Sequence, residues 1–138
     1  MEKRDWLLLC IGNRMEPIQI QKALFKFAME SGAPENELYT FIPYNWGPLS
    51  MEIYDNLGEL REGELVEFMP SGRGWNIYNL SEAGKERQNA LKNQANPDLL
   101  AKLNAARDYV TSRGFEELLE DIYAEYPDYA TASLFRKV

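Results

Sequence analysis

The sequence predicts an α+β fold that is mostly helical. Several segments repeat apolar residues at the three- and four-residue spacing of a helix with one buried face. Two short runs rich in β-branched and aromatic residues flank a loop with two glycines, a pattern typical of an antiparallel hairpin. The chain has 138 residues, of which 45% are hydrophobic and 27% charged. A chain of this length buries a core without needing metal ions or disulfides.

The first two helices are predicted near the N-terminus. The first is expected from about Asp5 to Gly12. The second begins at Glu16-Pro17, because proline suits the first position of a helix. It continues to Met29 and ends before Gly32 and Pro34. Its predicted buried stripe is Ile20, Leu24, Phe27 and Ala28.

A connector and a third helix follow. The run Tyr39–Tyr44 is interpreted as an extended connector or edge strand, and Asn45–Ser50 as a turn. Ser50 is expected to cap a helix that spans Met51 to Arg61 and ends at Gly63. The buried stripe expected for that helix is Ile53, Leu57 and Leu60, with Tyr54 alongside.

The remaining elements are a hairpin and three helices. Strands are predicted over Glu64–Met69 and Trp75–Leu80, joined by the loop Pro70–Gly74. Ser81 is expected to cap a helix over Glu82–Ala95, and Asn96-Pro97 starts another that reaches Ser112. The inner face expected for that helix is Leu99, Leu103, Ala106 and Val110. The last helix has a broad apolar face of Phe115, Leu118, Leu119, Ile122, Tyr123 and Tyr126, and Pro127 ends it.

This order of elements predicts a winged helix-turn-helix with a two-stranded wing and a C-terminal helical extension. The strongest local signal is Tyr78 to Glu86, where the second wing strand passes into a capped helix. Residues 1–95 are expected to form the winged domain. Residues 96–138 are expected to form the helical extension, which packs on the domain or forms a dimer interface.

Two segments also resemble a known family. They are Gln21-Lys22-Ala23-Leu24-Phe25 and Phe41-Ile42-Pro43-Tyr44-Asn45-Trp46-Gly47-Pro48-Leu49-Ser50. Together they resemble the Panacea-domain (SocA-like antitoxin) proteins and related small prokaryotic winged-helix proteins. The resemblance covers about Glu16 to Glu86 and departs from the family pattern at Trp46 and Leu49, where tyrosine or another aromatic residue is usual. It implies a non-enzymatic regulator or neutraliser that contacts DNA, a partner protein, or both.

The composition excludes several kinds of active site. The chain has no histidine and a single cysteine, so catalytic triads, Cys-His dyads and His- or Cys-ligated zinc are all excluded. Its 22 acidic residues lie along helical faces without a phosphate-binding loop or a metal-loop spacing. We therefore expect no enzymatic activity, cofactor or metal. Cys10 lies in an apolar run, which favours a packed thiol over a reactive one and fits a cytoplasmic protein. No segment is long and apolar enough for a membrane helix.

The distribution of charged residues bears on whether the chain binds DNA. The net charge is -7, and the outward residues of the helix after Ser50 are Glu52, Asp55, Asn56, Glu59 and Glu62, of which four are acidic. Carboxylates are repelled by phosphates, which counts against standard docking of this helix in a major groove. The residues available for DNA contact are Lys22, Lys26, Ser50, Arg73, Lys85 and Arg87. An ordinary solvated role for these charges is equally open.

Two hypotheses follow. The first is a DNA-binding transcriptional regulator on double-stranded DNA, acting as a homodimer through its C-terminal helices. The second is a protein-interaction module, antitoxin-like or part of a defence complex, in which Glu52, Asp55, Glu59 and Glu62 meet a basic partner. The scaffold favours the first hypothesis and the local charge favours the second. DNA binding comes first because winged scaffolds are most often used in that way.

Three aromatic residues of the segments that resemble the family are open to two interpretations, as core or hinge packing or as ligand contacts. They are Phe25, Tyr44 and Trp46.

Overall fold

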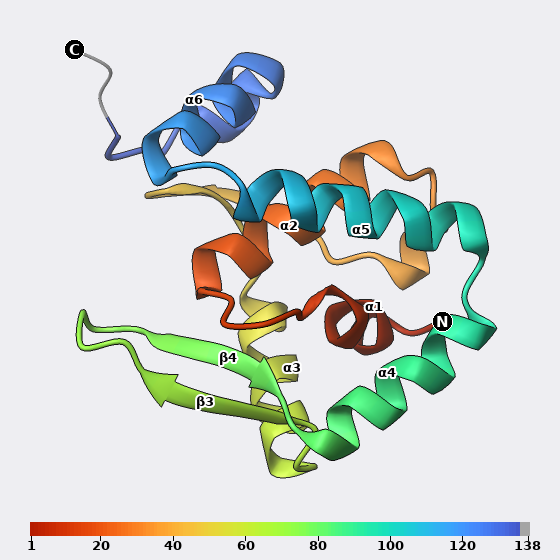
Figure 1. The fold of residues 1–138 in the computed structure, drawn as a ribbon. Coiled ribbons are helices and arrows are strands. Elements are labelled where there is room, and N and C mark those ends of the chain that lie inside the picture. Colours follow the sequence, from red (N-terminus) through yellow and green to blue (C-terminus); the bar gives the residue numbers. More distant parts are fainter. Residues whose placement is uncertain (136–138) are drawn as a thin grey trace.

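Six α-helices and two small antiparallel sheets make up the α+β fold in the computed structural model, which describes residues 1–135 (Figure 1). The helices are α1 (Lys3–Cys10), α2 (Pro17–Glu30), α3 (Met51–Glu62), α4 (Glu82–Gln94), α5 (Pro97–Thr111) and α6 (Phe115–Glu125). Two short 3-10 helices are η1 (Glu35–Glu37) and η2 (Pro127–Ala130). The sheets pair β1 (Ile42–Tyr44) with β2 (Gly47–Leu49), and β3 (Val66–Pro70) with β4 (Asn76–Leu80).

The predicted helices are all present, with shifted ends. The largest shift is in α1, which begins two residues before Asp5, because the backbone amide of Glu2 donates to the Asp5 carboxylate at 3.0 Å and starts the helix there. It stops at Cys10 because Ile11 is extended. The predicted end of the chain's last helix at Pro127 is also refined, since Pro127 opens the 3-10 turn η2.

The predicted hairpin between β3 and β4 is confirmed. Its register runs from Val66 opposite Leu80 to Pro70 opposite Asn76. Met15, in the link between α1 and α2, adds a third extended segment beside β4. The Met15 amide donates to the Tyr78 carbonyl at 3.0 Å, and the Tyr78 amide donates back at 2.9 Å. The link before α2 is thereby held against the middle of β4.

The turn into α4 is tightly packed. The Ser81 hydroxyl accepts the Gly84 amide at 2.9 Å, which confirms the predicted cap, and donates to the Glu64 carbonyl at 2.6 Å. A Cβ on Gly84 would lie 1.9 Å from the carbonyl oxygen of Leu65. Glycine is therefore required for α4 to approach the start of the hairpin this closely.

The hairpin between β1 and β2 was not predicted. The sequence predicted one edge strand over residues 39–44 and then a turn, whereas the structure pairs Ile42 with Leu49 and Tyr44 with Gly47. Pro43 faces Pro48 in this register, and proline has no N–H to donate to a ladder. Two facing prolines therefore obscure a strand pair that side chains from α2 hold in place.

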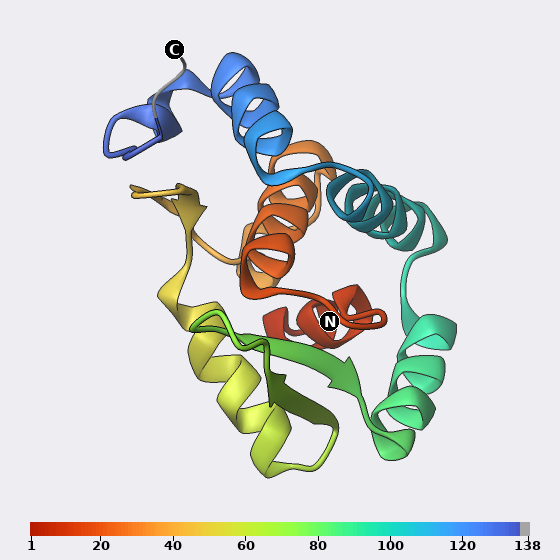
Figure 2. The same ribbon diagram turned by 60° about the vertical axis from the view of Figure 1, so that its left-hand side comes forward.

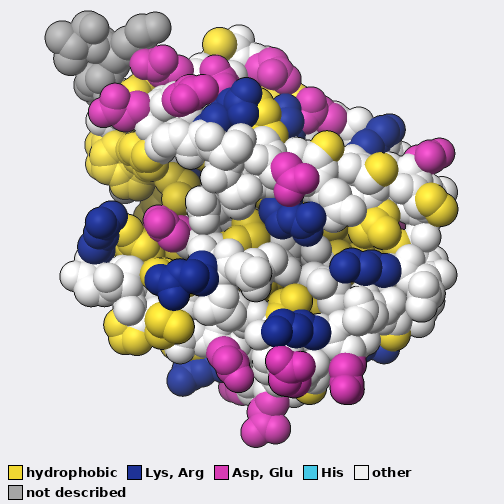
Figure 3. All heavy atoms as spheres, viewed as in Figure 1, with side chains coloured by type: hydrophobic (Ala, Val, Ile, Leu, Met, Phe, Trp, Pro, Cys, Tyr) yellow, Lys and Arg dark blue, Asp and Glu magenta, His cyan; other side chains and the backbone are white. Residues whose placement is uncertain are grey.

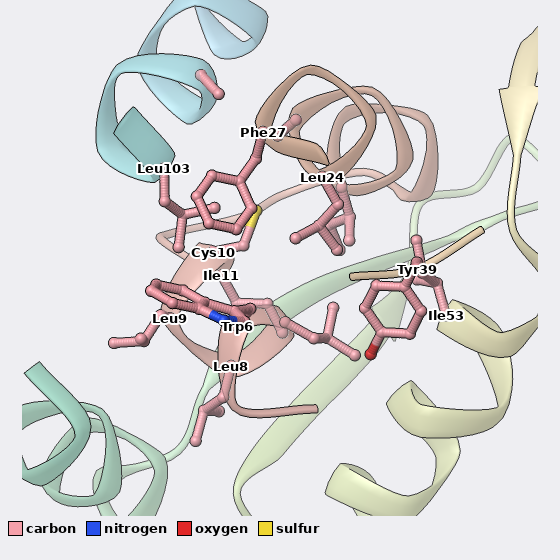
Figure 4. Packing of buried hydrophobic residues seen from close by; sticks show 14 of the residues in the cluster. Trp6, Leu8, Leu9, Cys10, Ile11, Leu24, Phe27, Tyr39, Ile53 and Leu103 are labelled. Atoms are coloured by element: carbon pink, nitrogen blue, oxygen red, sulfur yellow. The ribbon is translucent and has the colours of Figure 1, made fainter. Parts of the chain in front are cut away.

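The core lies where α1, α2, α3 and α5 meet (Figure 4). The rings of Trp6 and Phe27 lie 4.9 Å apart, and Leu103 of α5 packs beside them. The predicted α3 stripe of Ile53, Leu57 and Leu60 is buried, as are Ile20, Leu24 and Phe27 of α2. Cys10 is fully buried, and burial raises the pKa of its thiol to about 12, so the packed interpretation of this cysteine is confirmed.

The last two long helices cover one side of α2. Figures 1 and 2 show that α5 lies along α2, and that α6 follows beyond the C-terminal end of α5. Leu103, Ala106 and Val110 of α5 are buried in the same core, and Leu118 and Ile122 of α6 extend it. Phe115, at the start of α6, is partly exposed, and its ring lies against that of Trp46. This corner between α5 and α6 forms one wall of the site described next.

Candidate functional site

A large groove lies between the two hairpins and the corner that joins α5 to α6. Its volume is about 720 Å³, and five parts of the chain line it. They are the start of α2, the β1–β2 hairpin, the first turn of α3, the tip of the β3–β4 hairpin and the α5–α6 corner. We call it the aromatic groove, after its lining residues Tyr44, Trp46, Tyr54, Trp75 and Phe115.

These five aromatic side chains are exposed although they are large and apolar. Their exposed fractions range from 38% for Tyr54 to 48% for Tyr44. Trp46 and Phe115 face each other edge to face, with ring centroids 5.7 Å apart. Figure 3 shows apolar side chains gathered at the left edge of the molecule, beside the β1–β2 hairpin. The groove therefore presents partly exposed aromatic rings to water, two of which also contact each other.

A buried lysine lies beneath the groove. Lys22 is only 3% exposed, and its Nζ donates to the Pro48 carbonyl at 2.9 Å. Burial lowers the pKa of this amine from 10.5 to about 7. Gly47 makes room for the side chain, since it adopts a φ of +97° and an added Cβ would lie 2.9 Å from Lys22 Cε. Lys22, one of the residues predicted to contact DNA, is therefore almost fully buried, and that contact stays a prediction.

The neighbouring glutamine holds the end of β2. Gln21 Oε1 accepts the backbone amide of Ser50, and its Nε2 donates to the Ser50 carbonyl, both at 2.9 Å. Ser50 is buried and its hydroxyl does not cap α3. Its predicted role as a side-chain cap is therefore wrong, and the side chain that is predicted to contact DNA is buried. Gln21 and Lys22 together make three hydrogen bonds that fix the β1–β2 hairpin as a wall of the groove.

Two arginines lie in the lining. Arg73 is exposed in the loop between β3 and β4, flanked by Gly72 and Gly74, which both adopt positive φ. Its side chain makes no hydrogen bond or ion pair within residues 1–135. Arg113 stacks over the Tyr109 ring at 3.7 Å, and its Nε lies 3.4 Å from an Asp121 carboxylate oxygen.

The other basic residues predicted for DNA contact lie on helices and not in the loop between β3 and β4. Lys26 pairs with Glu30 at 2.9 Å and lies over the Tyr109 ring at 4.4 Å. Lys85 and Arg87 are exposed on α4, which follows the end of β4 opposite the loop that carries Arg73. Lys85 also pairs with Glu82 at 3.2 Å. The structure therefore does not collect the predicted basic residues on one surface.

The acidic helix α3 is partly neutralised by the N-terminus. Lys3 lies 3.1 Å from Glu52, and Arg4 lies 2.6 Å from Glu59, because α1 packs beside α3. Asp55 and Glu62 are exposed and make no ion pair within the described part of the chain. Two of the four carboxylates predicted to meet a basic partner are thus already paired inside the molecule.

Sequence reasoning found part of this site. Tyr44 and Trp46 were recognised as possible ligand contacts, whereas Tyr54, Trp75 and Phe115 were assigned to structural elements only. An available signal was that Trp75 and Phe115 each follow a glycine in a predicted turn. Neither a family model nor a curated protein matches this chain. Residues 1–135 bring no three Cys, Asp or Glu side chains together as a metal ion would need. Over the same residues, no helix combines the length and apolar character needed to cross a bilayer.

Proposed function

We propose that this chain is a non-enzymatic protein-interaction module on a winged helix-turn-helix scaffold, and that its aromatic groove binds an apolar segment of a partner protein. One observation carries the proposal: five exposed aromatic side chains from separate parts of the chain line one cavity. Contiguous apolar surface is uncommon on soluble proteins and marks interaction sites. Aromatic residues are also enriched among the residues that dominate binding energy.

The scaffold assignment is supported by the order of elements. Three helices, α1, α2 and α3, precede the β3–β4 hairpin, and Met15 supplies a third extended segment between the first two helices. A glycine-rich hairpin tip and a capped helix then follow. The helical extension from residue 96 adds the wall that contains Arg113 and Phe115. A homodimer through these C-terminal helices stays a prediction, which sedimentation velocity tests.

The residues that carry the family resemblance lie at the groove, and the resemblance is compatible with a protein partner. The residues that carry it, 21–25 and 41–50, include Gln21 and Lys22, which hold the β1–β2 hairpin, and the groove residues Tyr44 and Trp46. The resemblance therefore falls on one wall of the groove and its support. The acidic face of α3 is a weaker candidate for the contact surface, because Glu52 and Glu59 already have partners.

Selection from a phage-displayed peptide library on the full chain tests the proposal. We expect enriched peptides whose affinity falls at least about tenfold when Trp46→Ala and Trp75→Ala are combined, as loss of aromatic anchors predicts. Met29→Ala is the matched control, since Met29 is an exposed apolar residue of α2 outside the groove. Thermal unfolding checks that each variant is folded. Failure to enrich any peptide, or equal binding by the double variant, would contradict the proposal.

DNA binding is the second candidate, and Arg73 is the observation that favours it. An unpaired arginine at a glycine-rich wing tip suits insertion into a minor groove. Fluorescence anisotropy with a mixed-sequence duplex at low ionic strength tests it. Arg73→Ala is expected to weaken binding and reduce its salt dependence. Absence of salt-sensitive binding by the wild-type chain would remove this candidate.

A further inference from the structure

We infer that the partner segment in the aromatic groove carries a carboxylate next to its apolar side chains, an inference that rests on the proposed function. The lining includes the cations Lys22, Arg73 and Arg113 and the carboxylate of Glu16. The whole chain has a net charge of -7. The lining thus has more basic than acidic side chains although the protein is acidic, and charge complementarity favours an anionic group in its occupant.

The charged side chains of the lining differ in whether they already have partners within the protein. The Glu16 side chain accepts the backbone amide of Gln19 at the start of α2, so it is engaged in capping that helix. Arg113 already has carboxylate neighbours, Asp121 and Glu117. Arg73 has no side-chain partner among residues 1–135, which leaves its whole guanidinium free to bind a carboxylate.

Lys22 adds a second basic group with unused hydrogen-bond donors. Its ammonium has three hydrogens, and its one hydrogen-bond acceptor within the described residues is the Pro48 carbonyl. No carboxylate lies within ion-pair distance of it in the same part of the chain. A charged amine buried without a counter-ion is costly, and a carboxylate in the groove above it would offset that cost.

The shape and charge favour a peptide over a nucleic acid. A volume of about 720 Å³ suits a few side chains, and aromatic walls suit apolar ones. Bases also stack on aromatic rings, but each nucleotide brings a phosphate that the acidic surface repels. Glu116 and Glu117, both exposed in the first turn of α6, stand next to the groove residue Phe115. A segment with one or two carboxylates among apolar residues is repelled less than a chain with a phosphate at every nucleotide.

A double-mutant cycle on a selected peptide tests the inference. The probe is an enriched peptide containing Asp or Glu, compared with the same peptide carrying Asn or Gln at that position. The wild-type chain is expected to lose about tenfold in affinity for the amide form, whereas Arg73→Gln loses much less. Lys85→Gln, which removes an exposed cation outside the groove, is expected to behave as wild type.

The possible failures are distinguishable. Peptides that depend on Trp46 and Trp75 but contain no acidic residue, or show no coupling to Arg73, would overturn the carboxylate inference and leave the proposed function standing. Peptides that ignore both tryptophans, or no peptides at all, would overturn both. A single-stranded oligonucleotide that displaces the peptide and depends on Trp46 would show that the groove binds bases, which also overturns both.

Discussion

The buried Lys22 beneath the groove is expected to make the free energy of unfolding depend on pH, by an amount that follows from its pKa. Burial lowers the pKa of Lys22 from 10.5 to about 7. Between these values the unfolded chain keeps a proton on this amine that the folded chain has released, so the free energy of unfolding rises with pH. Below about pH 7 both states hold the proton, and the folded state bears the full cost of the buried charge. At about 1.4 kcal/mol per pH unit, the expected gain between pH 7 and pH 8.5 is about 1.5 kcal/mol.

The perturbation is Lys22→Met, which keeps the length of the side chain and removes the titrating group. It also removes the hydrogen bond to the Pro48 carbonyl, which costs roughly 1–3 kcal/mol at every pH. Urea unfolding at both pH values separates the two effects. The lost hydrogen bond lowers the free energy of unfolding equally at both pH values, whereas the titration of Lys22 makes the difference between wild type and variant change with pH. That difference is expected to grow by about 1.5 kcal/mol in favour of the wild type on going to pH 8.5.

Lys26→Met is the matched control for this measurement. Lys26 lies one turn further along α2, and its ammonium reaches the Glu30 carboxylate at 2.9 Å. We expect this variant to keep the wild-type pH dependence. Parallel profiles for wild type and Lys22→Met would refute the argument, because they would mean that the buried amine does not change its charge over this range.

Three further substitutions test close packing and buried hydrogen bonds in the fold. Gly84→Ala places a Cβ 1.9 Å from the Leu65 carbonyl oxygen and is expected to cost about 3 kcal/mol, lowering the thermal midpoint by roughly 10 °C. Gly58→Ala, on the exposed face of α3 with no atom within 4 Å, is its control and is expected to raise the midpoint slightly. Gln21→Leu leaves the buried amide of Ser50 without its partner and removes one of the two donors to the Ser50 carbonyl, the other being the Ile53 amide, and is expected to cost about 2–4 kcal/mol in urea unfolding.

The elements that the sequence predicted well are those with local causes. The apolar stripes of α2 and α3 follow helical spacing, and Ser81 caps α4 through an amide three residues away. The pairing of β3 with β4 follows from two strand-like runs on either side of a glycine loop. In each case the residues that decide the structure lie within a few positions of one another.

The features that the sequence did not reveal depend on contacts between distant residues. Lys22 looked like a solvated charge, because its burial requires the space left by Gly47, which lies far along the chain. The β1–β2 hairpin has facing prolines, and its support comes from the amide of Gln21. The groove collects aromatic residues from position 44 to position 115, so no short pattern contains it.

The most direct test of the groove as a binding surface uses the three tryptophan indole N–H signals in a ¹H–¹⁵N spectrum. Trp46 and Trp75 line the groove, whereas Trp6 is buried in the core with its indole donating to Glu37 at 3.3 Å. On titration with a selected peptide, the Trp46 and Trp75 signals are expected to shift to saturation while the Trp6 signal stays in place. A peptide that saturates the chain without moving the Trp46 and Trp75 signals would contradict the account.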